Sequence, residues 1–263
     1  MGFFYFYTLK FQVYIIMNIK QYLDSTYLKT ASQANLSEKE NTQVVQNFIQ
    51  EAIEENFKLV MIRPDKVKLA KEMIVNANSK VLIGTVIDFP EGNSSLDDKI
   101  EEALQAVNNH ADELDFVINY QAFKKGEIDL VKKEIIACVQ LGISHKKVVK
   151  FIIEVAALTN QQIIQISALI KNTVIANFKE ENFPNIFVKS STGFYKTEDN
   201  LPNGATIPTI ILMLENSNPL PVKAAGGVRT LEEALAMIRL GVKRIGTSAA
   251  KTIADGNVAT GNY

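Results

Sequence analysis

Short apolar runs alternate with longer amphipathic stretches along the chain from Met17 onward. Most of the short runs are rich in Val, Ile or Phe and are bounded by Gly, Pro, Asn or Ser, as is typical of buried strands. Their nearly continuous apolarity favours parallel strands that are covered on both faces. We predict strands over Gln21–Leu28, Lys58–Ile62, Lys80–Ile87, Glu113–Asn119, Lys147–Val155, Ile186–Ser190, Pro221–Ala224 and Lys243–Thr247.

The stretches between these runs carry helix signals. Ser37 and Glu40 form a Ser-x-x-Glu pattern, which is typical of a helix N-terminus, and apolar residues then recur at helical spacing. Gly142 and Gly241 stand where a left-handed residue commonly ends a helix. We predict helices over Ser37–Asn56, Leu96–Asn108, Ile128–Leu141, Asn160–Asn177 and Thr230–Leu240.

The alternation of strands and helices indicates an α/β protein. We favour a single-domain (β/α)₈ TIM barrel, and a doubly wound open sheet is the alternative because it consists of the same βα units. We assign residues 17–255 to the barrel and residues 256–263 to a flexible C-terminal tail. Residues 1–16 are interpreted as an N-terminal extension ahead of a natural start at Met17.

The N-terminal extension is rich in aromatic residues, but Lys10 and Gln12 interrupt it. It is too short for a membrane span, and it lacks the basic opening and small-residue cleavage site of a signal peptide. A membrane-surface anchor is the alternative interpretation of this segment. For the rest of the chain we expect no membrane association.

The charge and cysteine content narrows the classes of function. The chain has 28 Lys and Arg against 29 Asp and Glu, a near balance that argues against a broad nucleic-acid surface. A single cysteine, Cys138, excludes an internal disulfide and a cysteine-based zinc site. With only His110 and His145, a histidine-rich metal centre is not expected either. We therefore expect a cytoplasmic protein without metal or cofactor.

Two lysines inside apolar strands are the most unusual residues of the sequence. Lys189 follows Ile-Phe-Val, and Lys223 follows Pro-Val in the next strand. Lysine is almost never buried without a partner or a purpose. If both amines point into the barrel at roughly 5 Å, their repulsion costs about 3 kcal/mol, which lowers the pKa of one of them. A neutral amine attacks carbonyl groups, whereas the alternative is that both lysines extend outward to solvent.

Glycine-rich segments that follow two neighbouring strands indicate a phosphate site. Gly226 and Gly227 precede Arg229 and Thr230 at a helix start, and the segment 244–248 follows the same plan. Glycines let backbone N–H groups approach an anion, and helix N-termini add partial positive charge. Thr192-Gly193, which follows the sixth predicted strand, would form a third side of this phosphate site. The alternative role of Arg229 is a surface charge at the start of a helix.

Two carboxylates near strand ends supply acid–base capacity. Asp115 lies within the fourth predicted strand, and Glu154 lies near the end of the fifth. Each could also simply balance a buried lysine, and the two roles are compatible. We expect the neighbouring Asp112 and Glu113 to face solvent before the strand begins.

These segments together resemble the 2-deoxyribose-5-phosphate aldolase family, whose members are class I aldolases with a barrel fold. The resemblance extends from about Gln21 to Ile253. It is carried by four blocks: Asp24–Lys29, Ala111–Asp115, Val188–Phe194 and Val222–Thr230. The last two blocks are highly specific, because a generic barrel would not be expected to show both at this spacing.

The resemblance implies a role for each matched residue. Lys189 would form the Schiff base, Lys223 would lower its pKa, and Asp115 would relay protons through water. Tyr263 would assist proton transfer, as the terminal tyrosine does in family members. The residues that would surround the substrate phosphate are Gly193, Gly226, Gly227, Arg229, Gly246 and Ser248. The remaining substrate pocket would contain Asp24, Thr26, Glu154 and Thr192.

Some positions depart from the family pattern. Met61 and Arg63 stand where many relatives have Cys and Asn, and Ala249 replaces a Ser that is common next to Ser248. The first two changes concern the shape of the pocket, and the third removes a hydroxyl near the phosphate. The lysine chemistry requires none of these residues.

The expected function is reversible cleavage of the phosphosugar 2-deoxy-D-ribose 5-phosphate to acetaldehyde and D-glyceraldehyde 3-phosphate. One alternative is another class I aldolase or a transaldolase that acts on a different phosphosugar. A second alternative is a non-catalytic barrel that binds a phosphosugar. We expect a homo-oligomer, with a dimer as the favoured state.

Overall fold

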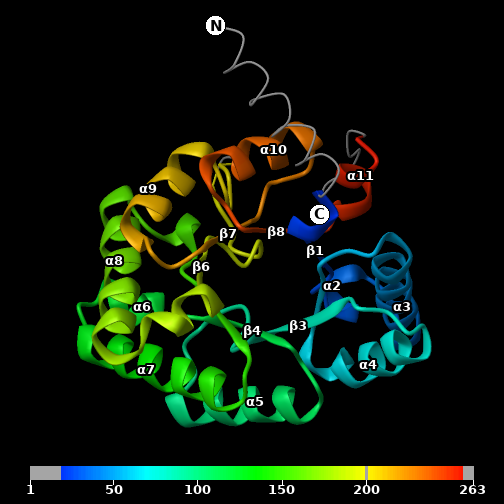
Figure 1. Cartoon of the computed structure of the whole chain (residues 1–263), viewed down its shortest axis with the longest axis horizontal. Helices are drawn as coiled ribbons and strands as arrows, with labels where there is room; N and C mark the ends of the chain where they lie inside the picture. Colours follow the sequence, from blue (N-terminus) through cyan, green and yellow to red (C-terminus); the bar gives the residue numbers. More distant parts are fainter. Residues whose placement is uncertain (1–18, 199–200, 257–263) are drawn as a thin grey trace, which may run out of the picture.

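Eight parallel strands close into a barrel in the order of the sequence, and β8 pairs with β1 to complete the ring. The computed structural model describes residues 19–198 and 201–256. Helices surround the strands on the outside (Figure 1). The strands are β1 (Leu23–Thr26), β2 (Leu59–Ile62), β3 (Leu82–Ile87), β4 (Glu113–Val117), β5 (Val148–Ile152), β6 (Ile186–Lys189), β7 (Val222–Ala225) and β8 (Arg244–Thr247). The predicted (β/α)₈ TIM barrel is therefore confirmed, and the open sheet is excluded.

The helices connect successive strands, and the five predicted helices are all present. The α-helices are α2 (Ala31–Ala34), α3 (Glu38–Glu55), α4 (Val67–Asn76), α5 (Leu96–Asn108), α6 (Tyr120–Lys124), α7 (Ile128–Ser144), α8 (Asn160–Asn177), α9 (Ile207–Ser217), α10 (Leu231–Leu240) and α11 (Ala250–Ala254). Short 3₁₀ turns are η1 (Ile19–Tyr22), η2 (Pro64–Lys66), η3 (Val155–Ala157) and η4 (Glu180–Asn185).

The sequence analysis did not identify α4 and α9, nor the short helices α2, α6 and α11. α9 begins with a capping box formed by Thr206 and Thr209, in which Thr replaces the usual Glu or Gln. Its first residues are rich in isoleucine, so the run resembles a strand by composition. In the folded chain α9 packs against α8, and its buried residues Ile210, Met213 and Ser217 recur at helical spacing.

Side chains alternate along each strand between the core outside the barrel, which lies under the helices, and the interior of the barrel itself. In β4, Leu114 and Phe116 belong to the large core between strands and helices, whereas Glu113 and Asp115 lie on the opposite face, inside the barrel. A smaller apolar cluster contains Leu59 and Met61 of β2, Val86 of β3, and Leu28, which follows β1. The barrel interior therefore has an apolar part near β2 and β3 and a charged part that extends from β4 through β8 to β1.

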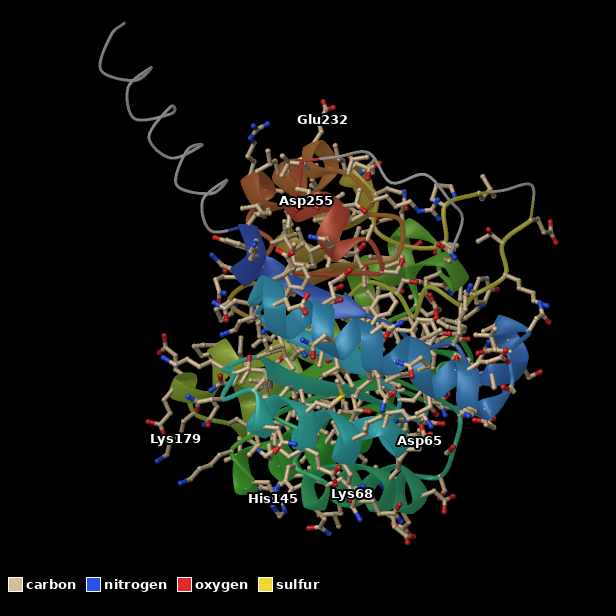
Figure 2. The ribbon with its side chains drawn as sticks, turned by 90° about the vertical axis from the view of Figure 1, so that its right-hand side faces the viewer. Asp65, Lys68, His145, Lys179, Glu232 and Asp255 are labelled. Carbon is tan, nitrogen blue, oxygen red and sulfur yellow. The ribbon has the colours of Figure 1, made fainter. Side chains whose placement is uncertain are left out.

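Charged side chains cover the outside of the molecule. Asp65, Lys68 and His145 project outward from the helical shell, and all three are exposed (Figure 2). None of the helices within residues 19–198 and 201–256 has the length and apolarity needed to cross a membrane. The proposed extension 1–16 and the predicted tail residue Tyr263 lie outside the described residues.

Candidate active site

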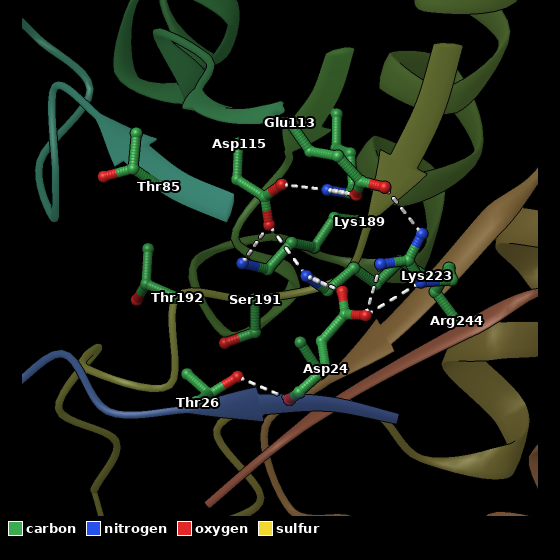
Figure 3. A network of polar contacts seen from close by, with 12 residues as sticks. Asp24, Thr26, Thr85, Glu113, Asp115, Lys189, Ser191, Thr192, Lys223 and Arg244 are labelled. Atoms are coloured by element: carbon green, nitrogen blue, oxygen red, sulfur yellow. Dashed lines mark hydrogen bonds and ion pairs between the residues drawn. The ribbon is translucent and has the colours of Figure 1, made fainter. Parts of the chain in front are cut away.

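Six strands bring seven charged side chains together inside the barrel. Six of them are labelled in Figure 3, where they lie close to one another, and each of the seven is at most 6% exposed. Strand pairing explains the arrangement, because Lys189 is in register with Lys223, and Asp115 is in register with Lys150. The seven residues are Asp24, Glu113, Asp115, Lys150, Lys189, Lys223 and Arg244.

Asp115 lies at the centre of this cluster. Its Oδ2 atom is 2.8 Å from the Nζ of Lys189 and 2.9 Å from the Nζ of Lys223. Its Oδ1 atom accepts a hydrogen bond from the Nζ of Lys150 at 2.5 Å. Burial alone would raise the pKa of Asp115, but the three lysines hold that pKa well below its usual value. Asp115 is therefore a carboxylate at neutral pH.

The amine of Lys189 has unusual acidity for a lysine. Burial is the largest cause, and it lowers the pKa of Lys189 to about 8, with Lys223 and Lys150 adding to the effect and Asp115 opposing it. At pH 7 about one molecule in ten then carries a neutral amine, compared with roughly one in 2,500 for an ordinary lysine. Both predicted lysines point inward, so outward extension is excluded. The sequence analysis treated Lys223 as the main cause, whereas the structure ranks burial first.

Glu113 does not face solvent, and that prediction is wrong. It is 2% exposed, and its Oε1 and Oε2 atoms lie 2.9 Å from Arg244 Nη1 and 2.6 Å from Lys150 Nζ. Glu113 lies two residues before Asp115 in β4, so strand alternation places both side chains on the same inner face. The predicted strand already began at Glu113, and the error was to treat this first residue as exposed, although its side chain shares the inner face of β4 with Asp115.

Lys150 and Arg244 were missed as site residues. Lys150 interrupts the apolar run of β5 in the same way that Lys189 and Lys223 interrupt theirs, so the signal was present in the sequence. Arg244 was grouped with the phosphate segment of β8, but its side chain points into the barrel. There Arg244 donates to Asp24 Oδ1 from Nε at 2.8 Å, and Asp24 Oδ2 lies 2.6 Å from Lys223 Nζ.

A cavity of about 100 Å³ opens above Lys189. Lys189, Thr26 and Thr192 line it, together with all six residues that were assigned to the substrate phosphate. Asp24, Asp115 and Lys223 are completely buried and are not among the lining residues. Gly246 contributes to the wall and also leaves room for Lys223, because a Cβ atom there would lie 3.0 Å from Lys223 Cε.

The loops that follow β6 and β7 are built around glycines. Gly193, Gly226 and Gly227 have φ angles of 79°, 80° and 92°, a region that glycine adopts without strain. The two loops are joined, because Ala205 N donates to Gly226 O at 2.7 Å. α10 begins directly after cavity residue Arg229 and the capping residue Thr230, so its N-terminal N–H groups lie beside this wall. These features suit an anionic ligand.

Glu154 lies behind the cavity wall instead of lining it. It follows β5 with a φ of 54°, and its carboxylate accepts hydrogen bonds from Ser191 Oγ at 2.8 Å and from Thr192 Oγ1. Burial raises the pKa of Glu154, although the bonds from Thr192 and Ser191 oppose this effect. Glu154 thus holds the loop that carries Thr192 and Gly193.

The two positions that depart from the family pattern near β2 have separate surroundings. Met61 is completely buried in the apolar cluster with Leu59 and Leu28. Arg63 donates from Nε to Leu28 O at 2.9 Å, and its guanidinium lies 5.0 Å from the centroid of the Phe89 ring. Within the described residues, no group of three or more His, Cys, Asp or Glu side chains is placed to hold a metal ion.

A closed barrel that places a buried amine with a lowered pKa on the wall of a cavity has the general architecture of a barrel enzyme. Comparison with known proteins gives the family. The sequence model of the DeoC/LacD family aldolases matches residues 21–259. The deoxyribose-phosphate aldolase of Thermococcus gammatolerans is 38% identical over 241 residues, which cover 91% of this chain and 96% of the relative.

Solved structures agree with this match. The aldolase QR15 superposes with a TM-score of 0.74 at 32% identity, covering 90% of this chain and 94% of the other. The tetrameric deoxyribose phosphate aldolase of Aeropyrum pernix gives a TM-score of 0.70 at 26% identity, covering 89% and 88% of the two chains. The chain belongs to the DeoC/LacD aldolase family, and it is a carbon–carbon lyase. The family resemblance predicted from the sequence is confirmed, and a non-catalytic barrel is excluded.

Proposed function

We propose that this aldolase cleaves 2-deoxy-D-ribose 5-phosphate reversibly to acetaldehyde and D-glyceraldehyde 3-phosphate through a Schiff base on Lys189. The observation that carries the proposal is the amine of Lys189, which has a pKa of about 8 and lines the same cavity as the glycine-rich wall that suits a phosphate group. The name of the Thermococcus gammatolerans relative supports the choice of substrate.

The first half of the reaction forms the covalent bond. The neutral Nζ of Lys189 adds to the aldehyde carbon of the open-chain sugar and gives a carbinolamine. Loss of water leaves a protonated imine, which withdraws electrons from the neighbouring carbon–carbon bond. Asp115 Oδ2 lies 2.8 Å from this amine, so it is placed to stabilise the cationic imine and to exchange protons through water.

The second half breaks the bond between carbons 2 and 3. Removal of the proton from the hydroxyl on carbon 3 turns that carbon into an aldehyde, while the electron pair of the broken bond moves into the imine and gives an enamine. D-glyceraldehyde 3-phosphate leaves. Protonation of the enamine at carbon 2 and addition of water then release acetaldehyde and regenerate Lys189.

The phosphate binds away from the reacting bond. We assign it to the wall formed by Gly193, Gly226, Gly227, Arg229, Gly246 and Ser248, which all line the cavity. Binding energy at this wall would fix the orientation of the aldehyde relative to Lys189. Tyr263 is kept as a candidate for proton transfer, and it lies outside the described residues.

A coupled assay of glyceraldehyde 3-phosphate release tests the proposal. Wild-type enzyme should cleave deoxyribose 5-phosphate, and Lys189→Met should not. Condensation with acetaldehyde and with dihydroxyacetone as alternative donors distinguishes this reaction from that of another class I aldolase or a transaldolase. Activity with dihydroxyacetone but not with acetaldehyde would contradict the proposed substrate.

Two further properties belong to the same proposal. A reducing cytoplasmic location is supported by the single cysteine, Cys138, which is buried in the core. A homodimer is the proposed assembly, whereas the Aeropyrum pernix relative is described as a tetramer. Light scattering of the purified enzyme would decide between the two states.

A further inference from the structure

Six of the seven buried charges form a closed ring of alternating sign. Starting from Asp115, the ring passes through Lys150, Glu113, Arg244, Asp24 and Lys223 and returns to Asp115. Every neighbouring pair in the ring is an ion pair of 2.5 to 2.9 Å. Three cations face three carboxylates, so the formal charge of the ring is zero.

Lys189 lies outside this ring and contacts it at one point, Oδ2 of Asp115. When Lys189 is protonated, the cluster contains four cations and three carboxylates, and it carries one surplus positive charge. When Lys189 is neutral, the charges balance. Because these groups are at most 6% exposed, solvent screens the surplus charge only weakly.

We propose that Lys150, Glu113 and Arg244 are positioning residues whose balanced charges orient Asp115 and make the proton of Lys189 the uncompensated charge of the site. None of these three side chains lines the cavity, so they act through Asp115, Asp24 and Lys223. The inference rests on the proposed role of Lys189 as the reacting amine.

The contacts of Asp115 show how the positioning works. Lys150 occupies Oδ1, which leaves Oδ2 for Lys189 and Lys223. Glu113 in turn holds Lys150, and Arg244 bridges Glu113 to Asp24. A substitution at Glu113 or Arg244, which do not contact Asp115 directly, therefore changes both the orientation of Asp115 and the electrostatic potential at Lys189.

Other charged groups also face Lys189. Lys223 approaches from β7 and Asp115 from β4, and Glu154, beyond the end of β5, interacts with Lys189 through space. Glu154 is not part of the ring. Its hydrogen bonds to Ser191 and Thr192 are separate from the ring contacts, so ring variants should leave them intact.

The test measures protonation of Lys189 directly, without turnover. Competitive labelling with acetic anhydride, followed by mass spectrometry of the Lys189 peptide, gives the neutral fraction of the amine at each pH from about 6 to 10. Lys150→Met removes one cation from the ring, so the neutral fraction of Lys189 at pH 7 should fall about tenfold. Glu113→Gln removes one carboxylate, so the neutral fraction should rise several-fold.

The double variant Lys150→Met/Glu113→Gln provides the decisive comparison. It restores the balance of charges, so its labelling curve should return close to that of the wild type. Arg244→Lys keeps the charge and should leave the curve nearly unchanged. Lys99→Met serves as the matched control, because Lys99 is a buried lysine whose ion pairs, to Asp88 and Glu134, lie outside the ring.

The inference is overturned if Lys150→Met and Glu113→Gln shift the curve in the same direction, or if the double variant does not restore it. Circular dichroism identifies any variant that fails to fold, and Glu113→Gln, which preserves shape, keeps the test decisive. Borohydride trapping of wild-type Lys189 with acetaldehyde is run in parallel. A lack of trapping with shifted labelling curves would refute the proposed function but not the ring.

Discussion

Two buried lysine networks in this barrel have opposite charge balances. Lys99 of α5 lies 2.5 Å from Glu134 Oε1 and 3.1 Å from Asp88 Oδ2, and it donates to Val117 O at 2.8 Å. One amine there meets two carboxylates. Around Lys189, four cations share three carboxylates, and Lys189 shares its partner oxygen with Lys223.

The two lysines are equally buried but differ in the charges that surround them. Lys99 and Lys189 are 1% and 2% exposed, so both are removed from water to the same extent. Lys99 joins α5 to α7 and to the end of β4, and its contacts serve the fold. Lys189 combines burial with surplus positive charge and lines a cavity, and this combination gives a neutral amine access to a ligand.

The largest expected effect is on catalysis. Lys189→Met should lower the rate of deoxyribose 5-phosphate cleavage by about five orders of magnitude, because the covalent step has no replacement. Lys99→Met should retain most of the activity per folded molecule. Steady-state assays, normalised to the folded fraction measured by circular dichroism, check both expectations. Comparable losses in the two variants would remove the distinction between the networks.

The second effect is on stability, where we expect Lys99→Met to be more damaging than Lys189→Met. Lys99→Met should lower the free energy of unfolding by about 3–5 kcal/mol, because Glu134 and Asp88 would remain buried without their cation. Lys189→Met should be neutral or slightly stabilising, because Asp115 keeps Lys150 and Lys223 as partners. Urea unfolding of the two variants measures this difference. A greater loss of stability in Lys189→Met would contradict the account.

The third effect is a pH dependence. The folded-state pKa of Lys189, about 8, lies below its ordinary value, so the amine loses its proton as pH rises through 8. Below that value kcat/KM should fall by nearly tenfold for each pH unit, and it should reach a plateau above it. Rates measured between about pH 6 and 9.5 give the profile. A flat profile across pH 8 would mean that the proton of Lys189 does not limit the reaction.

The smallest effect concerns the phosphate wall. Arg229→Gln should raise KM for deoxyribose 5-phosphate by roughly tenfold, because one charge at the cavity rim is lost. The kcat for non-phosphorylated deoxyribose should change little. Kinetics with both sugars measure the difference between them. An equal effect on both sugars would place Arg229 outside the phosphate site.

The sequence predicted the fold because most strands, such as β2 and β3, are apolar runs with clear boundaries, and it identified Lys189 and Lys223 because they interrupt such runs. Glu113 and Arg244 could not be assigned from strand ends alone. Their roles depend on which face of a strand they occupy and on partners in other strands, such as Asp24. The dominance of burial in lowering the pKa of Lys189 likewise requires the depth of the residue, which only the closed barrel shows.

The central claim is that the neutral amine of Lys189 bonds covalently to the aldehyde. Mass spectrometry after borohydride reduction in the presence of acetaldehyde tests it most directly, with Lys99→Met and Lys189→Met as parallel samples. The account predicts one added ethyl group on the Lys189 peptide in wild type and in Lys99→Met, and none in Lys189→Met. An adduct on a different lysine, or equal trapping in Lys189→Met, would contradict it.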